Sequence, residues 1–246
     1  MGRTWELKET LPGRRWVYYG KLLRGRPVLV ALDLFPAFYA LVRGRQRSRD
    51  YRAEYEAGRL SHTAKRLMDA LTRRHPLYTR EWRAEGLLLD PGRTREFERA
   101  VAELQQALFV VKTAERYEPS FSYRWDLVDA WLPDGVRAGR RLGRPAAARF
   151  LVSRYLQGAG WASLRQLARL FGLTAAEAVA AVEALGRAGE VREAVRLAGL
   201  PGEWIVHRDA LPPRGRSRPV PTVGHGGDTR SAQSPGGRGP HGQSPR

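Results

Sequence analysis

The residues of this sequence that could do chemistry are a small number of carboxylates. Asp33 directly follows the apolar segment VLVAL and precedes LFPAFYALV, which we expect to form a strand and a helix. A carboxylate at such a junction projects from a rigid support, which suits a catalytic role. Capping of the following helix is the simpler interpretation. Asp33 is therefore the candidate catalytic residue, with helix capping as its alternative.

Other catalytic signatures are missing from the sequence. Asp126 and Asp129 lie within WDLVDAW, where we expect them to cap a helix or pair with arginine. The sequence holds no Walker-type phosphate loop, no GxSxG elbow and no HExxH motif. It has no cysteine, and its five histidines lack ligand spacing. We therefore expect neither a metal ion nor an organic cofactor.

The elements that would carry such residues form a recognisable succession near the end of the chain. Ser163 and Gln166 make a capping box over SLRQLARLFG, and Thr174 and Glu177 make another over the next helix. A helix over 144–157 precedes them, and the segments GEVREAVRLAG and EWIVHRD follow as two strands. Three helices followed by a hairpin is the order of a winged helix.

The same order occurs earlier in the chain. Three predicted helices, LSHTAKRLMDALTRRH, TREWRAEG and REFERAVAELQQA, are followed by the predicted strands LFVVKTAER and SFSYRWDLV. Thr79 is the expected cap of the second of these helices. The fold class predicted from this repetition is mainly α with small β-hairpins (α+β), built from tandem winged helix-turn-helix domains.

The remaining segments complete the expected organisation. Upstream, RRWVYYGKLLRG predicts an amphipathic helix, and the aromatic residues there are expected in the core rather than stacked on bases: Trp16, Tyr19, Phe35, Phe38 and Tyr39. The predicted domains are an N-terminal helix-strand-helix segment packing on the next domain (1–50), a first winged helix (51–131), a basic linker (132–143), a second winged helix (144–211) and a disordered basic Pro/Gly-rich tail (212–246).

The charge indicates a polyanionic partner. The formal net charge is +18, and arginine outnumbers lysine 39 to 4, a skew that GC-rich coding alone can produce. Long runs without acidic residues, such as 135–176, favour phosphate contact over the alternative of solvated helix faces. The residues expected to contact DNA are Arg14, Arg15, Lys21, Arg24, Arg26, Arg93, Arg95, Arg137, Arg140, Arg141, Arg144, Arg165 and Arg169.

The two candidate recognition helices carry little net positive charge. Glu96, Glu98 and Glu103 offset the arginines of the first, and the surface of the second is mostly alanine. We therefore expect these helices to serve largely as packing elements, while arginines outside them hold the DNA backbone.

No apolar run approaches the length of a membrane span, and the N-terminus lacks the apolar core of a signal peptide. The expected location is the cytoplasm, with no membrane partner.

Several longer stretches resemble a known family. WELKETLPGRRWVYYGKLLRGRPVLVALDLFPAFYAL, DYRAEYEAGRLS and TREFERAVAELQQALFVVK are together similar to the AlkZ/YcaQ-like family of winged-helix DNA glycosylases, over about Trp5 to Val206. The resemblance implies tandem winged helices around a duplex and, in active members, excision of bulky alkylated bases or unhooking of interstrand crosslinks.

Two departures from the family pattern matter. The Gln-apolar-Gln or Gln-apolar-Asp motif of active members has Ala31-Leu32-Asp33 as its best counterpart, so only Asp33 fits. The family tends to begin with a further winged helix, so we expect a shortened or divergent member. Alanine at position 31 cannot orient water for attack on an oxocarbenium-like centre.

Three functions follow as hypotheses. The leading one is a DNA-binding tandem winged-helix protein of DNA repair that grips duplex, including alkylated or crosslinked duplex, through arginine and phosphate. The alternatives are an active monofunctional glycosylase that uses Asp33 and a winged-helix transcriptional regulator.

Overall fold

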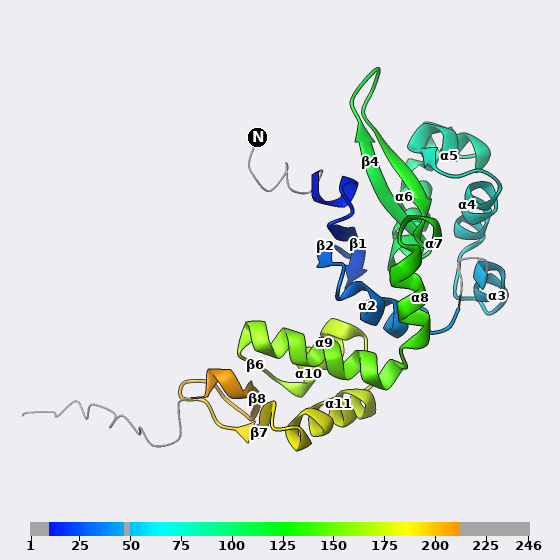
Figure 1. The fold of residues 1–246 in the computed structure, drawn as a ribbon. Coiled ribbons are helices and arrows are strands. Elements are labelled where there is room, and N and C mark those ends of the chain that lie inside the picture. Colours follow the sequence, from blue (N-terminus) through cyan, green and yellow to red (C-terminus); the bar gives the residue numbers. More distant parts are fainter. Residues whose placement is uncertain (1–9, 47–49, 212–246) are drawn as a thin grey trace, which may run out of the picture. The chain divides into compact units, whose positions relative to one another are not determined.

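The fold was taken from a computed structural model, which describes residues 10–46 and 50–211 (Figure 1). It is a mixed α+β structure with small antiparallel sheets. The predicted disordered tail at 212–246 lies outside the described residues. The predicted domain boundaries remain a prediction.

After a helical turn at residues 10–13, the chain forms an antiparallel hairpin where a helix over RRWVYYGKLLRG had been expected. Strand β1 (Val17–Leu23) pairs with β2 (Arg26–Ala31), and Leu23 lies opposite Arg26. Arg24 and Gly25 both have positive φ, 53° and 68°, which is typical of a two-residue hairpin turn. The helix prediction was wrong because the β-branched and aromatic run VYY favours a strand and the Arg-Gly turn gives little sequence signal.

Helix α2 (Phe35–Val42) packs against α8 (Pro133–Arg141). The predicted basic linker at 132–143 is therefore largely a helix, which Pro133 opens. Gly139 permits the contact, because a Cβ there would lie 2.7 Å from the carbonyl oxygen of Pro36. The arginines of α8 consequently project from a packed helix rather than from a free connection.

The first three-helix succession forms largely as predicted. The helices α4, α5 and α6 are followed by the hairpin of β4 and β5, and a short strand, β3, joins the sheet in the order β3-β5-β4. Tyr78, not Thr79, is the N-cap of α5. The elements are α3 (Tyr51–Glu56), α4 (His62–Arg73), β3 (Leu77–Tyr78), α5 (Thr79–Glu85), a 3-10 turn (Pro91–Arg93), α6 (Thr94–Gln106), β4 (Val110–Arg116), β5 (Ser122–Leu127) and α7 (Val128–Trp131).

The second succession has the same order. Both predicted capping boxes are present, and Gly172 ends α10 in the left-handed conformation. A short strand again joins the sheet beside the last strand, in the order β6-β8-β7. The elements are α9 (Arg144–Ala159), β6 (Trp161–Ala162), α10 (Leu164–Phe171), α11 (Ala175–Arg187), β7 (Val191–Val195), β8 (Trp204–His207) and a 3-10 turn (Arg208–Ala210).

Two apolar cores hold these elements. One surrounds Trp82, which is fully buried and donates from Nε1 to the carbonyl oxygen of Leu67 at 2.8 Å. The other joins the N-terminal hairpin and α2 to α8, α9, α10 and α11. Of the N-terminal aromatics, Phe35, Phe38 and Tyr39 are buried there as expected, whereas Trp16 is 60% exposed.

Candidate functional site

Asp33 lies in the turn between β2 and α2, with 63% of its side chain exposed. Leu34, not Asp33, is the N-cap of α2, and α2 has no side-chain cap. Helix capping therefore does not explain Asp33. Its nearest charged neighbour among the described residues is Arg154 on α9, whose guanidinium lies 3.9 Å from the carboxylate.

An apolar pocket of about 700 Å³ opens beside this turn. Ala31, Leu34, Phe38 and Tyr155 line it, and Arg154 contributes its polar edge. Pockets of this volume with a few polar groups are typical of ligand sites. Asp33 does not itself line the pocket, but its exposed carboxylate lies next to Leu34 in the chain and 3.9 Å from the guanidinium of Arg154, both of which do.

Two of the predicted DNA-contacting arginines meet at another hollow. Arg24, at the turn of the β1-β2 hairpin, and Arg169, on α10, both line a pocket of about 250 Å³ with an apolar floor that includes Phe38 and Phe171. Both arginines are exposed, and neither forms an ion pair within the described part of the chain. Two unneutralised guanidinium groups at one hollow are suited to a phosphate.

Most of the other predicted contacts are also exposed. Arg15 lies with its guanidinium 4.2 Å from the centre of the Trp131 ring, and Arg14 lies near Trp16. Lys21 is half-buried. Four more of the predicted contacts are exposed and form no ion pair among residues 10–46 and 50–211. They are Arg26, Arg95, Arg141 and Arg165.

Four of the predicted contacts have partners inside the protein. Arg144 donates to both carboxylate oxygens of Glu177 and to the carbonyl oxygens of Leu41 and Gly172. It therefore ties α9 to α2, to the end of α10 and to α11, and these bonds hold its guanidinium in place. The others are Arg93, bonded to Glu96 and the Leu87 carbonyl; Arg137, paired with Asp134; and Arg140, bonded to the Arg45 carbonyl.

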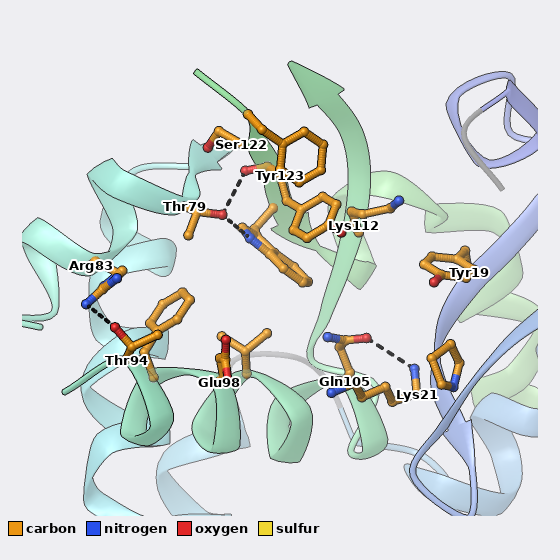
Figure 2. A pocket seen from close by; sticks show the side chains of 15 residues that line it. Tyr19, Lys21, Thr79, Arg83, Thr94, Glu98, Gln105, Lys112, Ser122 and Tyr123 are labelled. Atoms are coloured by element: carbon orange, nitrogen blue, oxygen red, sulfur yellow. Dashed lines mark hydrogen bonds between the residues drawn. The ribbon is translucent and has the colours of Figure 1, made fainter. Parts of the chain in front are cut away.

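A third pocket, of about 570 Å³, lies among the hairpin, α5, α6 and the β4-β5 strands (Figure 2). Its apolar surface comes mostly from aromatic rings. Tyr123 and Trp125 are neighbours along β5, with ring centroids 5.9 Å apart, and Phe121 stacks edge-on against Tyr123 at 5.0 Å. Tyr19 from β1 and Phe97 from α6 complete the set of rings.

A buried lysine lies among these rings. Lys112 is 4% exposed, and its Nζ lies 4.6 Å from the Tyr19 ring centre and 4.9 Å from that of Tyr123. It is ion-paired with Glu115, which is buried as well. Burial first, then Tyr123 and Glu115, raise the pKa of the Tyr19 phenol, so Tyr19 stays a neutral hydrogen-bonding group.

Two polar side chains of α6 face the same pocket. Glu98 forms no hydrogen bond or ion pair within the described part of the chain. Gln105 is 7% exposed and accepts the backbone N–H of Lys21 with its Oε1 at 3.1 Å. Figure 2 shows its amide nitrogen directed away from Lys21, toward the pocket. The pocket thus offers an open acceptor and an open donor beside aromatic faces.

Asp126 and Asp129 do not form a second acidic site. Asp126 is 8% exposed, and its Oδ1 lies 2.7 Å from Nδ1 of His75 and 2.8 Å from the backbone nitrogen of Leu127. Asp126 was expected to cap a helix or to pair with arginine, whereas the structure pairs it with a histidine and gives α7 no side-chain cap. Asp129 is half-buried in α7.

Glu98, Gln105 and Lys112 were not singled out as a site from the sequence. Thr94, Glu98, Val101 and Gln105 recur at helical spacing, so polar groups share one face with an apolar residue. That mixed stripe, together with a lysine inside the apolar strand VVKT, is the signal that could have indicated a polar pocket.

Comparisons with known proteins are consistent with a repair protein. The model of the family described as AlkZ related matches residues 1–172. Searches of the curated proteins and of the solved structures gave no match. Among the described residues, no group of three His, Cys, Asp or Glu side chains could hold a metal ion, and no helix is long and apolar enough to cross a membrane. The chain belongs to the AlkZ-related family and, by that membership, is a glycosylase-like protein related to DNA repair.

Proposed function

We propose that this chain is a tandem winged-helix protein that binds duplex DNA in repair, holding the backbone through arginine and phosphate. The order helix, strand, helix, helix, strand, strand occurs twice, and both sheets place the last strand in the centre. This repeated topology supports two winged helices, because the fold is defined by that order of elements. Family membership supports DNA as the partner.

The observation that carries the proposal is the meeting of Arg24 and Arg169 at one hollow. The two arginines come from distant parts of the sequence, and neither forms an ion pair with any acidic residue that the structure describes. A phosphate between them gains two charge-assisted contacts over an apolar floor, where charges interact more strongly than in bulk water.

The recognition helices are less suited to hold DNA. The first, α6, is covered at its C-terminal end by β1, because Gln105 accepts the backbone N–H of Lys21. The second, α11, begins at Thr174 and uses Glu177 to bind Arg144. Arginines outside both helices therefore supply the grip, and little direct reading of base sequence is expected.

The proposal is tested by the affinity of the full chain for labelled duplexes of random and selected sequence. Comparable affinities that fall steeply with salt are expected from phosphate contacts. A large preference for one selected sequence would favour a transcriptional regulator instead. The absence of duplex binding at low salt would reject the proposal.

A second candidate function is base excision that uses Asp33. It is favoured by the exposure of Asp33, by its lack of a capping role and by the neighbouring apolar pocket. The carboxylate would stabilise the oxocarbenium-like centre formed at C1′ of the sugar. Purified chain on N-alkylated duplex should then release the free alkylated base and leave an abasic site, as water adds at C1′, and Asp33→Asn should abolish the release. No release above background by the unmodified chain would reject this function.

A further inference from the structure

We infer that the pocket lined by Tyr19, Tyr123 and Glu98 binds a single unstacked nucleobase that carries an exocyclic amino group. This inference rests on the proposed DNA binding and gives it a second contact besides phosphate. It concerns the aromatic pocket of about 570 Å³ and not the pocket beside Asp33.

The aromatic rings are the first reason. Planar bases stack on aromatic side chains, and single bases taken out of a helix are commonly held this way. Phe121, Tyr123 and Trp125 form a continuous row along one strand, with neighbouring centroids 5.0 Å and 5.9 Å apart. Phe121 is half exposed and Trp125 is buried, so the row runs from the surface into the protein.

The unpartnered polar groups are the second reason. Glu98 has no partner among the described residues, and its carboxylate can only accept hydrogen bonds. Gln105 has its oxygen occupied by Lys21, which leaves its amide nitrogen as a donor. Carboxylates accept from the exocyclic amino group of cytosine, and an amide donates to a ring nitrogen or a carbonyl. A base with an amino group therefore fits better than thymine or uracil.

The β1-β2 hairpin connects this pocket to the pocket of about 250 Å³ that Arg24 and Arg169 line. The pairing register of β1 shifts between Gly20 and Leu23, and an irregularity of this kind redirects the side chains of a strand. Tyr19 and Lys21 line the aromatic pocket, and Leu22 lines the hollow that contains Arg24. One short hairpin thus adjoins both the base pocket and the phosphate site. A DNA strand with one displaced base requires two such sites close together.

The electrostatics favour a neutral base over a cationic ligand. The cation that would occupy an aromatic cage is already supplied by Lys112, which lies between the Tyr19 and Tyr123 rings. Its charge is balanced by Glu115 inside the protein. Arg83 and Lys21, at the pocket wall, attract a nucleic acid backbone toward the opening.

The test uses photocrosslinking of the full chain to DNA that contains one 5-iodocytosine. Three oligonucleotides are compared: a duplex with the iodocytosine paired, a duplex with it unpaired opposite a mismatch, and a single strand. We expect at least tenfold more crosslinking from unpaired than from paired iodocytosine, at peptides containing Tyr19, Phe121, Tyr123 or Trp125. Crosslinking in the mismatched duplex identifies a displaced base as the ligand, whereas crosslinking only in the single strand identifies an open strand.

Two variants assign the effect to the pocket. Tyr123→Ala should lower the yield from unpaired iodocytosine about tenfold, in line with the loss of one stacking contact. Because Tyr123 packs in the core, Glu98→Leu serves as the variant that keeps the fold. In this variant the ratio of the crosslinking yield from unpaired iodocytosine to the yield from iodouracil at the same position should fall about tenfold. Glu56→Leu, on the exposed face of α3, is the matched control and should behave as the unmodified chain does.

The outcomes separate this inference from the proposed function. Binding of paired duplex with crosslinks only at other aromatic residues, such as Trp16 or Tyr117, overturns the inference and leaves the duplex binding intact. Pocket crosslinks to a single strand without duplex binding support the inference and overturn the proposed function. An unchanged base preference in Glu98→Leu overturns the role of the carboxylate, and an absence of binding to any oligonucleotide overturns both.

Discussion

The backbone N–H of Lys21 donates a 3.1 Å hydrogen bond to the side-chain oxygen of Gln105. This bond joins the N-terminal hairpin to α6, and Gln105 is nearly buried beneath it. The contact covers the C-terminal end of α6, which is the recognition helix of the proposed first winged helix, and both residues line the aromatic pocket. The hairpin therefore contacts the first helical succession through α6, while its buried side chains belong to the core of α2, α8, α9, α10 and α11.

Replacement of Gln105 by leucine should weaken the protein. The Lys21 N–H would lose its acceptor in a half-buried position, which costs about 1 to 2 kcal/mol in the free energy of unfolding. Urea denaturation measures this, with Gln106→Leu as the control at the exposed neighbouring position. Equal stability of the two variants would show that the hairpin does not depend on this bond.

Replacement of Gly139 by alanine should disturb the contact between α2 and α8. The added methyl group would lie 2.7 Å from the Pro36 carbonyl oxygen and 2.9 Å from Cβ of Tyr39, both closer than atoms tolerate. Overpacking of this kind costs about 1 to 3 kcal/mol. Gly158→Ala in α9, where no atom lies within 4 Å of the new Cβ, should instead be neutral or stabilising by about 0.5 kcal/mol. A neutral Gly139→Ala would mean that these helices are not in close contact.

Replacement of Arg144 by methionine should destabilise the fold and leave the salt dependence of DNA binding unchanged. Its guanidinium bonds to Glu177, Leu41 and Gly172, so its removal leaves these groups without a donor, at a cost of about 2 kcal/mol. Thermal unfolding measures the loss, and Arg149→Met, an exposed position on the same helix, is the control. A shallower salt dependence in Arg144→Met would instead assign Arg144 to a phosphate.

The same ion pair predicts a pH dependence. The bond from Arg144, followed by the bond within the Thr174 cap, lowers the pKa of Glu177 from 4.5 to about 2. Because the folded pKa lies below the unfolded one, the contribution of Glu177 to stability is complete above about pH 4.5 and is lost as the pH falls toward 2. Unfolding measured across this range should show a shallower acid dependence in Glu177→Gln than in the unmodified chain. Identical acid dependence would exclude the ion pair as its cause.

The sequence predicted the second helical succession better than the N-terminal segment. Ser163, Gln166, Thr174 and Glu177 make local capping contacts, which depend on residues three positions apart and can be read directly. The β1-β2 hairpin turns at Arg24, a residue that rarely adopts positive φ, so no turn signal marked it. Local rules predict elements whose stabilising contacts are local.

The candidate sites depend on contacts between distant residues, which the sequence does not state. A surplus of arginine was plain, but it did not distinguish Arg144, bonded to three parts of the fold, from Arg169, which faces solvent. Likewise, Glu98 was noted only as a charge that offsets arginine, whereas its place in the same pocket as Tyr123 follows from the packing of α6 on β1 and β4. Asp33 lies between a strand and a helix, as predicted, and its side chain is 63% exposed, whereas its catalytic role stays a prediction.

The proposed binding of duplex DNA depends most directly on phosphate contact by Arg24 and Arg169. Each phosphate contact contributes about 0.9 to the slope of log affinity against log salt concentration. The double variant Arg24→Gln, Arg169→Gln should therefore bind duplex with a slope smaller by about 2 than that of the unmodified chain, while the same two substitutions at Arg149 and Arg196, which are also exposed, serve as the control. A slope that is unchanged in the Arg24 and Arg169 variant, or reduced as much in the control, would contradict the account.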